Sequence, residues 1–533
     1  MANQPNDYLF QLIRSLSKAE KRSFKIYAMR NSSEEAKFIQ LFDAIDKSKE
    51  YSEELLIHKL DGIKKTQLSN LKAHLYRQLL TSLRLNYTNH NIDIQLREQI
   101  DYARILYDKG LYKQSLKILD KAKLVAHEHH RVPLSSEILG FEKLIESQYI
   151  TRSFDHRADD LIEQTKEVLQ SEQQYHQLSN LALRLYSLYI KTGHVRNEAD
   201  YQRIQAFFEQ ALSSLRPEKM GFYEQHYLHV SHAWYSLIVQ DFLLQYRHAQ
   251  KWVDHFRHHP NMLQADPIWY LKGVHVLLEA LFIVGHYDRH EEEMKKLKEF
   301  LVNPPSRSNT NLKTLGWQYY YTSQINHFFM NGEFEKGITI IPELSAQMQK
   351  WSYRIDSHRI LVFHYKIACL YFGAGNLQKT IEHCAHIIQY PDPHLREDLH
   401  CFARILTLIA HIELGNEQLV QYQVRSTYRF LRRMNDLNSV QEEVLLFLRN
   451  LPQTNEDQLA RKFKKLHSKL IELQKKPYQK RAFLYLDIIS WLDSKIQNTT
   501  IRSLIANGDA QHTQTFQAIS DILLKENIHK LTF

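Results

Sequence analysis

Residues 103–124 read ARILYDKGLYKQSLKILDKAKL, and residues 368–388 read ACLYFGAGNLQKTIEHCAHII. In each stretch an apolar helical pattern runs up to a glycine, Gly110 or Gly375, and a second such pattern starts shortly after it. Glycine just beyond the end of a helix can adopt positive φ and turn the chain back on itself. Each stretch therefore predicts two helices that pack together as a hairpin.

The same pattern recurs through the middle of the chain at a mean spacing of about 44 residues. Each hairpin leaves an apolar face that only the next hairpin can cover, so a run of them is expected to stack into a superhelix. We predict about eight hairpins between residues 91 and 435, wound into a right-handed array. The further turns are expected at Gly193, Gly285, Gly332 and Gly415, and on weaker patterns near Arg152 and Leu244.

This pattern resembles the tetratricopeptide repeat, which has a small residue in its first helix, a glycine turn, an aromatic residue and a small residue in its second helix. Ala103, Gly110, Tyr112 and Ala122 occupy these places in the first unit. The resemblance covers roughly residues 95–435. It departs from the family in its period, which is about 34 residues there, and in lacking the family's Trp and Leu-Gly signature. The resemblance implies that the first helix of each hairpin lines a concave face that binds another protein.

The composition favours an all-α protein. Glycine supplies 14 and proline 12 of the 533 residues, far below the usual share of about 7% and about 5%, and a sheet protein needs such residues at short intervals. No apolar stretch of about 18 uncharged residues is present, so no membrane span is expected. The start, Met1–Arg14, lacks a signal-peptide pattern, and three cysteines do not form a disulfide framework. A cytoplasmic location is therefore expected.

Residues 1–90 predict a separate helical domain. They hold 15 Lys and Arg against 10 Asp and Glu, which is more than half of the chain's net charge of +9. The stretch Leu16–Arg22 resembles the opening of uncharacterised bacterial helical proteins. The capping boxes Ser17–Glu20 and Ser32–Glu35 mark helix starts, and helices are expected at 6–14, 17–31, 33–47, 52–60 and 65–88.

Residues 436–533 predict a helical cap on the repeat array, because a terminal unit of a stacked array needs a more polar outer face. A polar loop is expected between Asn498 and Thr513. Helices are expected near 438–450, 456–474, 478–496 and 512–528.

The leading functional hypothesis is a non-enzymatic scaffold or adaptor that binds a peptide or helix of another protein in a concave groove. Four of the nine candidate groove residues are Lys or Arg, which favours an acidic partner. The alternative for this groove is filling by the chain's own C-terminal helices. The candidate residues are Arg97, Arg104, Asn180, Lys191, Lys272, His275, Glu279, Tyr319 and Asn326.

The second hypothesis is a DNA-binding transcription regulator whose repeats sense a peptide or mediate dimerisation. Residues 52–88 give a short helix, a turn at Gly62 and a longer basic helix, as in a helix-turn-helix, where the second helix enters the major groove. The other explanation is an N-terminal hairpin packed on the repeats. The candidate nucleic-acid contacts are Lys64, Lys65, Gln67, Asn70, Lys72 and Arg77.

Catalysis and cofactor binding are not expected. The chain has no glycine-rich phosphate loop, no Gly-x-Ser-x-Gly elbow and no His-Glu-x-x-His motif. It has 30 histidines, some clustered as in His226, His229 and His232, and imidazoles three or four residues apart on a helix can share a metal ion. A chain this rich in histidine produces such pairs by chance, and the second ligand pair of a zinc module is missing, so no metal site is expected.

Overall fold

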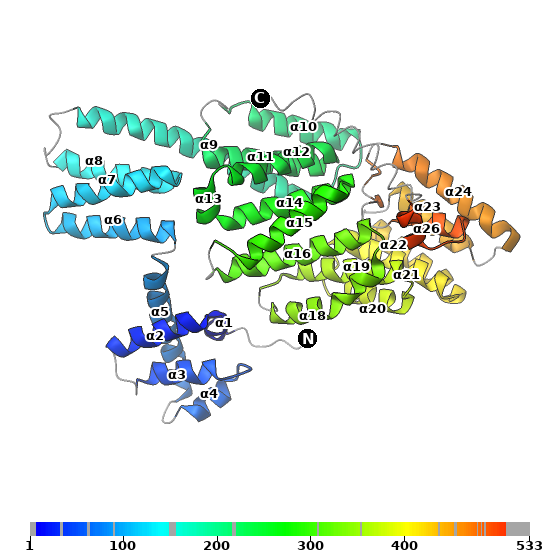
Figure 1. The fold of residues 1–533 in the computed structure, drawn as a ribbon, viewed down its shortest axis with the longest axis horizontal. Helices are drawn as coiled ribbons and strands as arrows, with labels where there is room; N and C mark the ends of the chain where they lie inside the picture. The colour runs from blue at the N-terminus through cyan, green and yellow to red at the C-terminus, as the bar shows by residue number, and fades with distance from the viewer. Residues whose placement is uncertain are drawn as a thin grey trace.

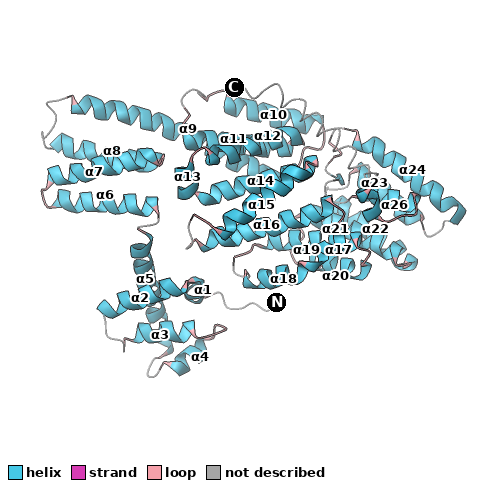
Figure 2. Cartoon of the chain, in the orientation of Figure 1, coloured by secondary structure: helices cyan, strands magenta, loops and turns pink. Residues whose placement is uncertain are grey.

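The protein is all-helical, as the composition predicts. A computed structural model describes residues 7–507, except for 32–35, 61–63, 89–90, 149–155, 216–219, 306–308, 352–353, 435–437, 452–455, 477, 481 and 484–486. Every regular element in these described ranges is a helix (Figure 2). Consecutive helices pack side by side along most of the chain, so each new helix covers the apolar face that its predecessor leaves exposed.

The N-terminal region forms a helical unit with its own hydrophobic core, in which the rings of Phe24 and Phe42 lie 4.8 Å apart. The predicted capping box is present, because the Ser17 amide donates to Glu20 Oε2 at 2.7 Å and the Glu20 amide donates to Ser17 Oγ at 3.2 Å. The second box, Ser32–Glu35, lies outside the described residues. The unit contains α1 (Tyr8–Ser15), α2 (Lys18–Asn31), α3 (Lys37–Asp46), α4 (Glu53–Lys59) and α5 (Lys65–Tyr87).

The helix α5 leads from this unit to the next three helices, which pack on one another in order (Figure 1). Their shared core contains Leu96, Leu116, Ile138 and Phe141. The three helices are α6 (Ile92–Asp108), α7 (Tyr112–Glu128) and α8 (Val132–Gln148).

The middle of the chain continues with paired helices, and the first helices of successive pairs also contact each other: α14 packs on α16, α16 on α19 and α19 on α21. The helices are α9 (Arg157–Thr192), α10 (Glu198–Leu212), α11 (Phe222–Ile238), α12 (Phe242–Arg257), α13 (Pro260–Ala265), α14 (Pro267–Val284), α15 (Tyr287–Val302), α16 (Thr310–Met330), α17 (Phe334–Thr339), α18 (Ile341–Lys350), α19 (Ser357–Gly373), α20 (Leu377–Ile388), α21 (Glu397–Glu413) and α22 (Glu417–Arg433).

Glycine turns join many of these helices. All six glycines that the sequence pattern singled out have positive φ, between 64° and 77°: Gly110, Gly193, Gly285, Gly332, Gly375 and Gly415. The weaker prediction of a turn near Leu244 is wrong, because Leu244 lies inside α12. The chain turns instead at Gln240, whose φ is +63°. A pattern based on glycine turns does not predict this position. The turn predicted at Arg152 falls outside the described residues.

The C-terminal region packs back on the preceding helices. It contains α23 (Ser439–Asn450), α24 (Glu456–Gln474), α26 (Ile488–Ile496) and α27 (Ile501–Ala506). Its buried side chains share one hydrophobic cluster with residues of α19 to α22, so residue 435 does not separate two cores.

Two expectations for this region need correction. The predicted helix at 478–496 is not continuous, since Tyr478 has a φ of +67° and α26 begins only at Ile488. Part of the predicted polar loop forms α27, which begins where the Thr500 hydroxyl accepts a hydrogen bond from the Ser503 amide. The helix predicted at 512–528 lies outside the described residues.

Among the described residues, one helix, α14, is long and apolar enough to cross a membrane by length and composition alone. It packs between α12, α15 and α16. The core helix of a folded domain passes the same test, and α14 carries Lys272 and Glu279 within its apolar run.

Candidate functional site

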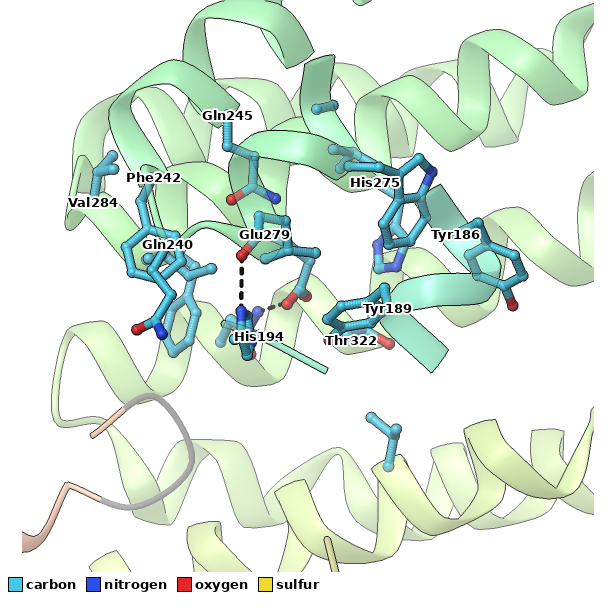
Figure 3. Close-up of a pocket in the computed structure, with 18 of the residues that line it drawn as sticks. Tyr186, Tyr189, His194, Gln240, Phe242, Gln245, His275, Glu279, Val284 and Thr322 are labelled. Carbon is cyan, nitrogen blue, oxygen red and sulfur yellow. Dashed lines mark hydrogen bonds between the residues drawn. The ribbon is translucent and has the colours of Figure 1, made fainter. Parts of the chain in front are cut away.

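A large cavity lies between helices from the middle of the chain. Its volume is about 1930 Å³, and its walls come mainly from α9, α11, α14, α16 and α19. Figure 3 shows Tyr186 and Tyr189 of α9 and His275 and Glu279 of α14 arranged around the same space. A volume of this size exceeds the usual pocket for a small molecule, which is roughly 300–1,000 Å³.

Helix periodicity explains why three of these helices present polar groups to the cavity. Residues four or seven apart lie on the same face of an α-helix. His275 and Glu279 have this spacing on α14, Tyr319 and Asn326 on α16, and Arg359 and Lys366 on α19. Because the three helices pack in the order α14, α16, α19, their cavity faces form one continuous surface.

The first row of contacts across this surface joins His275, Tyr319 and Arg359. The rings of His275 and Tyr319 stack with centroids 4.0 Å apart, and the Arg359 guanidinium lies 4.8 Å from the centre of the Tyr319 ring. Burial lowers the pKa of His275 well below its usual value, and the charges of Arg359 and Lys366 lower it further. His275 is therefore neutral at physiological pH and stacks as an uncharged ring.

The second row joins Glu279, Asn326 and Lys366. Asn326 is 1% exposed; its Nδ2 donates to Glu279 Oε1 at 3.0 Å, and its Oδ1 accepts from Lys366 Nζ at 2.5 Å. The buried amide thus holds the Glu279 carboxylate on one side and the Lys366 ammonium on the other. An ammonium group carries three donors, so Lys366 has hydrogen-bonding capacity left after this contact.

Two nitrogen atoms of the first row are buried without a hydrogen bond. They are Nδ1 of His275 and Nε of Arg359, and no described residue bonds to either. Buried polar atoms are normally satisfied, by protein, water or ligand. Both side chains line the cavity, but the two nitrogen atoms themselves have almost no accessible surface, so a ligand could bond to them only after these side chains shift.

A third cation, Lys272, lies one turn before His275 on α14. Its ammonium nitrogen is 4.5 Å from the centre of the Trp269 ring. Burial lowers its pKa, and no carboxylate among the described residues lies within ion-pair distance of it, of Arg359 or of Lys366. These three cations on α14 and α19 therefore make no ion pair with the described part of the chain.

The C-terminal part of α9, from Leu183 to Ile190, gives the cavity a largely apolar wall. Leu183, Tyr186 and Ile190 line the cavity and are 65%, 45% and 52% exposed. The Tyr186 ring lies 5.1 Å from that of Trp234 on α11, and the Tyr189 ring 5.4 Å from the same ring. Exposed apolar side chains in a concave surface are typical of binding sites.

The chain's own C-terminal region forms one edge of this cavity. Phe483, Ile501 and Ile505 are among its lining residues. Two of its contacts with earlier helices lie near this edge: the Tyr478 hydroxyl donates to Glu198 Oε2 at 2.7 Å, and Arg502 pairs with Glu335 at 3.3 Å. The described C-terminal residues therefore border the cavity and leave its volume open.

The structure brings together six of the nine residues that the sequence suggested for the groove. Arg97 and Arg104 are exposed on α6, where Arg104 lies 3.7 Å from the centre of the Phe141 ring, and Lys191 is exposed near the end of α9. These three residues do not line the cavity. The six that do are Asn180, Lys272, His275, Glu279, Tyr319 and Asn326.

The sequence analysis missed Arg359 and Lys366. Seven of the nine candidate residues lie six or thirteen residues before a glycine turn, and on α19 these positions are Cys369 and Val362. The two cations lie one helical turn earlier on the same face. A search over adjacent turns would have found them, because the face of a helix includes positions three and four residues away. Burial raises the pKa of the Cys369 thiol to about 12, so this group stays protonated at neutral pH.

The candidate nucleic-acid contacts fall into two groups. Lys64, Lys65, Asn70 and Arg77 are exposed. Gln67 and Lys72 already have internal partners: Gln67 Oε1 accepts from the Lys64 amide at 3.1 Å. Lys72 pairs with Asp7, donates to the Tyr51 hydroxyl at 2.6 Å and lies 3.3 Å from Glu53 Oε1. Gly62, at the expected turn, is outside the described residues.

The clustered histidines lie mainly between neighbouring helices. His229 and His248 approach within 3.4 Å through their Nδ1 atoms, and the rings of His232 and His248 stack 4.0 Å apart. Burial lowers the pKa of His229 to about 3 and that of His248 to about 2. Over the described part of the chain, no three His, Cys, Asp or Glu side chains are placed to hold a metal ion.

Comparison with known proteins adds no relative. No family model, no curated protein and no solved structure matches this chain.

Proposed function

We propose that this protein is a non-enzymatic interaction scaffold or adaptor that binds an extended segment of another protein in its central cavity. The observation that carries the proposal is the composition of that cavity. An apolar wall from α9 faces a polar surface from α14, α16 and α19, and this surface holds three cations that have no ion-pair partner among the described residues.

The chemistry of the walls suits a peptide. Large aromatic side chains give contact area to an extended chain, and a few buried anchors usually supply most of the affinity. Long-range attraction from unpaired cations favours an acidic segment and speeds its association. The size of the cavity, about 1930 Å³, allows several residues of a segment to enter together.

The proposal includes a fold assignment: a superhelix of about eight hairpins resembling tetratricopeptide repeats, with a helical N-terminal domain and a C-terminal cap. Support comes from the six positive-φ glycines at the expected turns and from the contacts between successive first helices. In such an array the first helices line the concave side, and α14, α16 and α19 all line the cavity. We place the protein in the cytoplasm.

The test is a pull-down from native cell lysate with the tagged full chain, run with and without nuclease. Two matched variants distinguish the cavity from the rest of the surface. Leu183→Asp puts a charge on the cavity wall, where the side chain is 65% exposed, and Leu124→Asp puts the same charge on α7, where it is 72% exposed. We expect a defined protein to bind the wild type and Leu124→Asp in both arms and to be lost from Leu183→Asp. Equal recovery by the two variants would contradict the proposal.

The second candidate is a transcription regulator in which α5 binds DNA. The exposure of Lys65, Asn70 and Arg77 on α5 and of Lys64 at its N-cap favours it, and the ion pairs of Lys72 weaken it. Phosphate contacts make affinity fall steeply with salt. The test is the binding of a labelled duplex at about 50 and about 200 mM salt, comparing the wild type with Lys64→Glu/Lys65→Glu. Unchanged retention in the variant would exclude this helix as the contact.

A further inference from the structure

The two cations of α19 lie at separate levels of the cavity. Arg359 ends the row that begins at His275, and Lys366 ends the row that begins at Glu279. They are seven residues apart on one helical face, so their Cα atoms are separated by about 10 Å along the helix axis. One small anion is therefore too short to contact both cations. Two anionic groups held at a similar spacing could each bind one of them.

Each cation is fixed in place by a buried neighbour. Tyr319, 5% exposed, supports the Arg359 guanidinium, and Asn326, 1% exposed, accepts from Lys366. Neither neighbour neutralises the charge, and the side chains of Arg359 and Lys366 are both partly exposed and line the cavity. A guanidinium has five donors and an ammonium three, so both groups can bind a carboxylate without losing these contacts.

The spacing of the cations matches a periodicity of extended chains. In the polyproline II conformation the rise is about 3.1 Å per residue with three residues per turn, so side chains three apart point the same way and lie about 9 Å from each other. In a fully extended strand, same-side residues lie about 6.7 Å apart, which is a poorer match to about 10 Å.

We propose, building on the function proposed above, that the cavity selects a segment with two acidic side chains three residues apart, one bound by Arg359 and the other by Lys366. The apolar wall of α9, where Leu183 and Tyr186 are exposed, takes apolar residues next to the acidic pair. Glu279 lies across Asn326 from Lys366, and its negative charge disfavours a third acidic residue at that level.

The experiment is a selection of phage-displayed random 12-residue peptides on the full-length protein. The matched variants are Arg359→Met and Lys366→Met, with Lys191→Met as the control because Lys191 is exposed and does not line the cavity. We expect the wild type and Lys191→Met to enrich peptides with Asp or Glu at positions i and i+3. Each α19 variant should enrich peptides with only one of the two acidic residues.

A double-mutant cycle on a selected peptide then assigns each contact. Replacing either acidic residue by its amide should weaken binding to the wild type about tenfold or more. The same replacement should have little effect on the variant that lacks the matching cation, and this comparison holds even if a variant is less stable. Enrichment without an i, i+3 acidic pair, or a pair that persists in both α19 variants, would overturn this inference alone. Failure of the wild type to enrich any peptide would overturn the proposed function as well.

Discussion

The contact between α17 and α19 forms part of the cavity wall, and one methyl group should weaken it. An ideal Cβ on Gly373 would lie 2.3, 2.4 and 2.6 Å from Cδ1, Cε1 and Cγ of Phe334. Phe334 is 3% exposed and its ring packs against that of Phe329, with centroids 5.8 Å apart, so moving the ring would disturb that contact. Overpacking of this kind costs about 1–3 kcal/mol, whereas alanine in place of a helical glycine stabilises by at most about 1 kcal/mol. Gly373→Ala should therefore lower the free energy of local unfolding of α17 and α19 by about 1–2 kcal/mol.

Hydrogen–deuterium exchange measures this loss where it occurs. A loss of 1–2 kcal/mol corresponds to exchange about 5–30 times faster, and we expect it in peptides from α17 and α19. The control is Gly140→Ala on α8, where a new Cβ meets no atom within 4 Å. The same substitution should there slow exchange, up to about fivefold. Unchanged or slower exchange of α17 and α19 in Gly373→Ala would refute the reasoning.

Three further predictions concern other parts of the fold. Lys72→Met removes the ion-pair partner of Asp7, whose side chain is 9% exposed, and should destabilise the N-terminal unit by about 2 kcal/mol, seen as faster exchange in α1 and α5. Burial lowers the pKa of His248 to about 2, whereas the unfolded imidazole binds a proton below about pH 6.5. The stability of the folded protein should therefore fall as the pH drops below that value. In a series of melting curves at decreasing pH, the melting temperature of His248→Gln should fall less steeply than that of the wild type. Gly332→Ala should lower the melting temperature more than Gly375→Ala. Both glycines have positive φ, at +64° and +77°, but only at Gly332 would a new Cβ crowd α27, where Ile505 Cβ lies 3.2 Å away.

Much of the fold was predictable from local signals. Glycine at a helix end has a distinct conformational role, and this is why six turns could be located from residue type alone. Gln240 adopts the same positive φ without a glycine, so no local signal marks that turn and tertiary packing decides it. The helix α27 was also missed, because its Thr500 cap lies in a stretch that reads as a polar loop.

The candidate site was only partly predictable. The position of each residue relative to the next glycine turn identified Lys272, Tyr319 and Asn326, because these residues lie on the helix faces that line the cavity. The same position relative to a glycine turn also selected Arg104, yet α6 contributes nothing to the cavity walls. Which repeats enclose a space depends on how the array curves and where the C-terminal region attaches, and neither is visible in the periodicity of one helix.

The central claim is that a partner segment lies inside the cavity, and site-specific photocrosslinking tests it most directly. A benzophenone side chain replaces Tyr186, which lines the cavity, or Tyr102 on α6, which does not; both are 45% exposed. We predict that irradiation in native cells links a defined protein through position 186 and not through position 102, and that Lys366→Met reduces the product. Crosslinks from position 102 alone would contradict the account. So would equal crosslinking from both positions together with a position-186 product that Lys366→Met leaves unchanged.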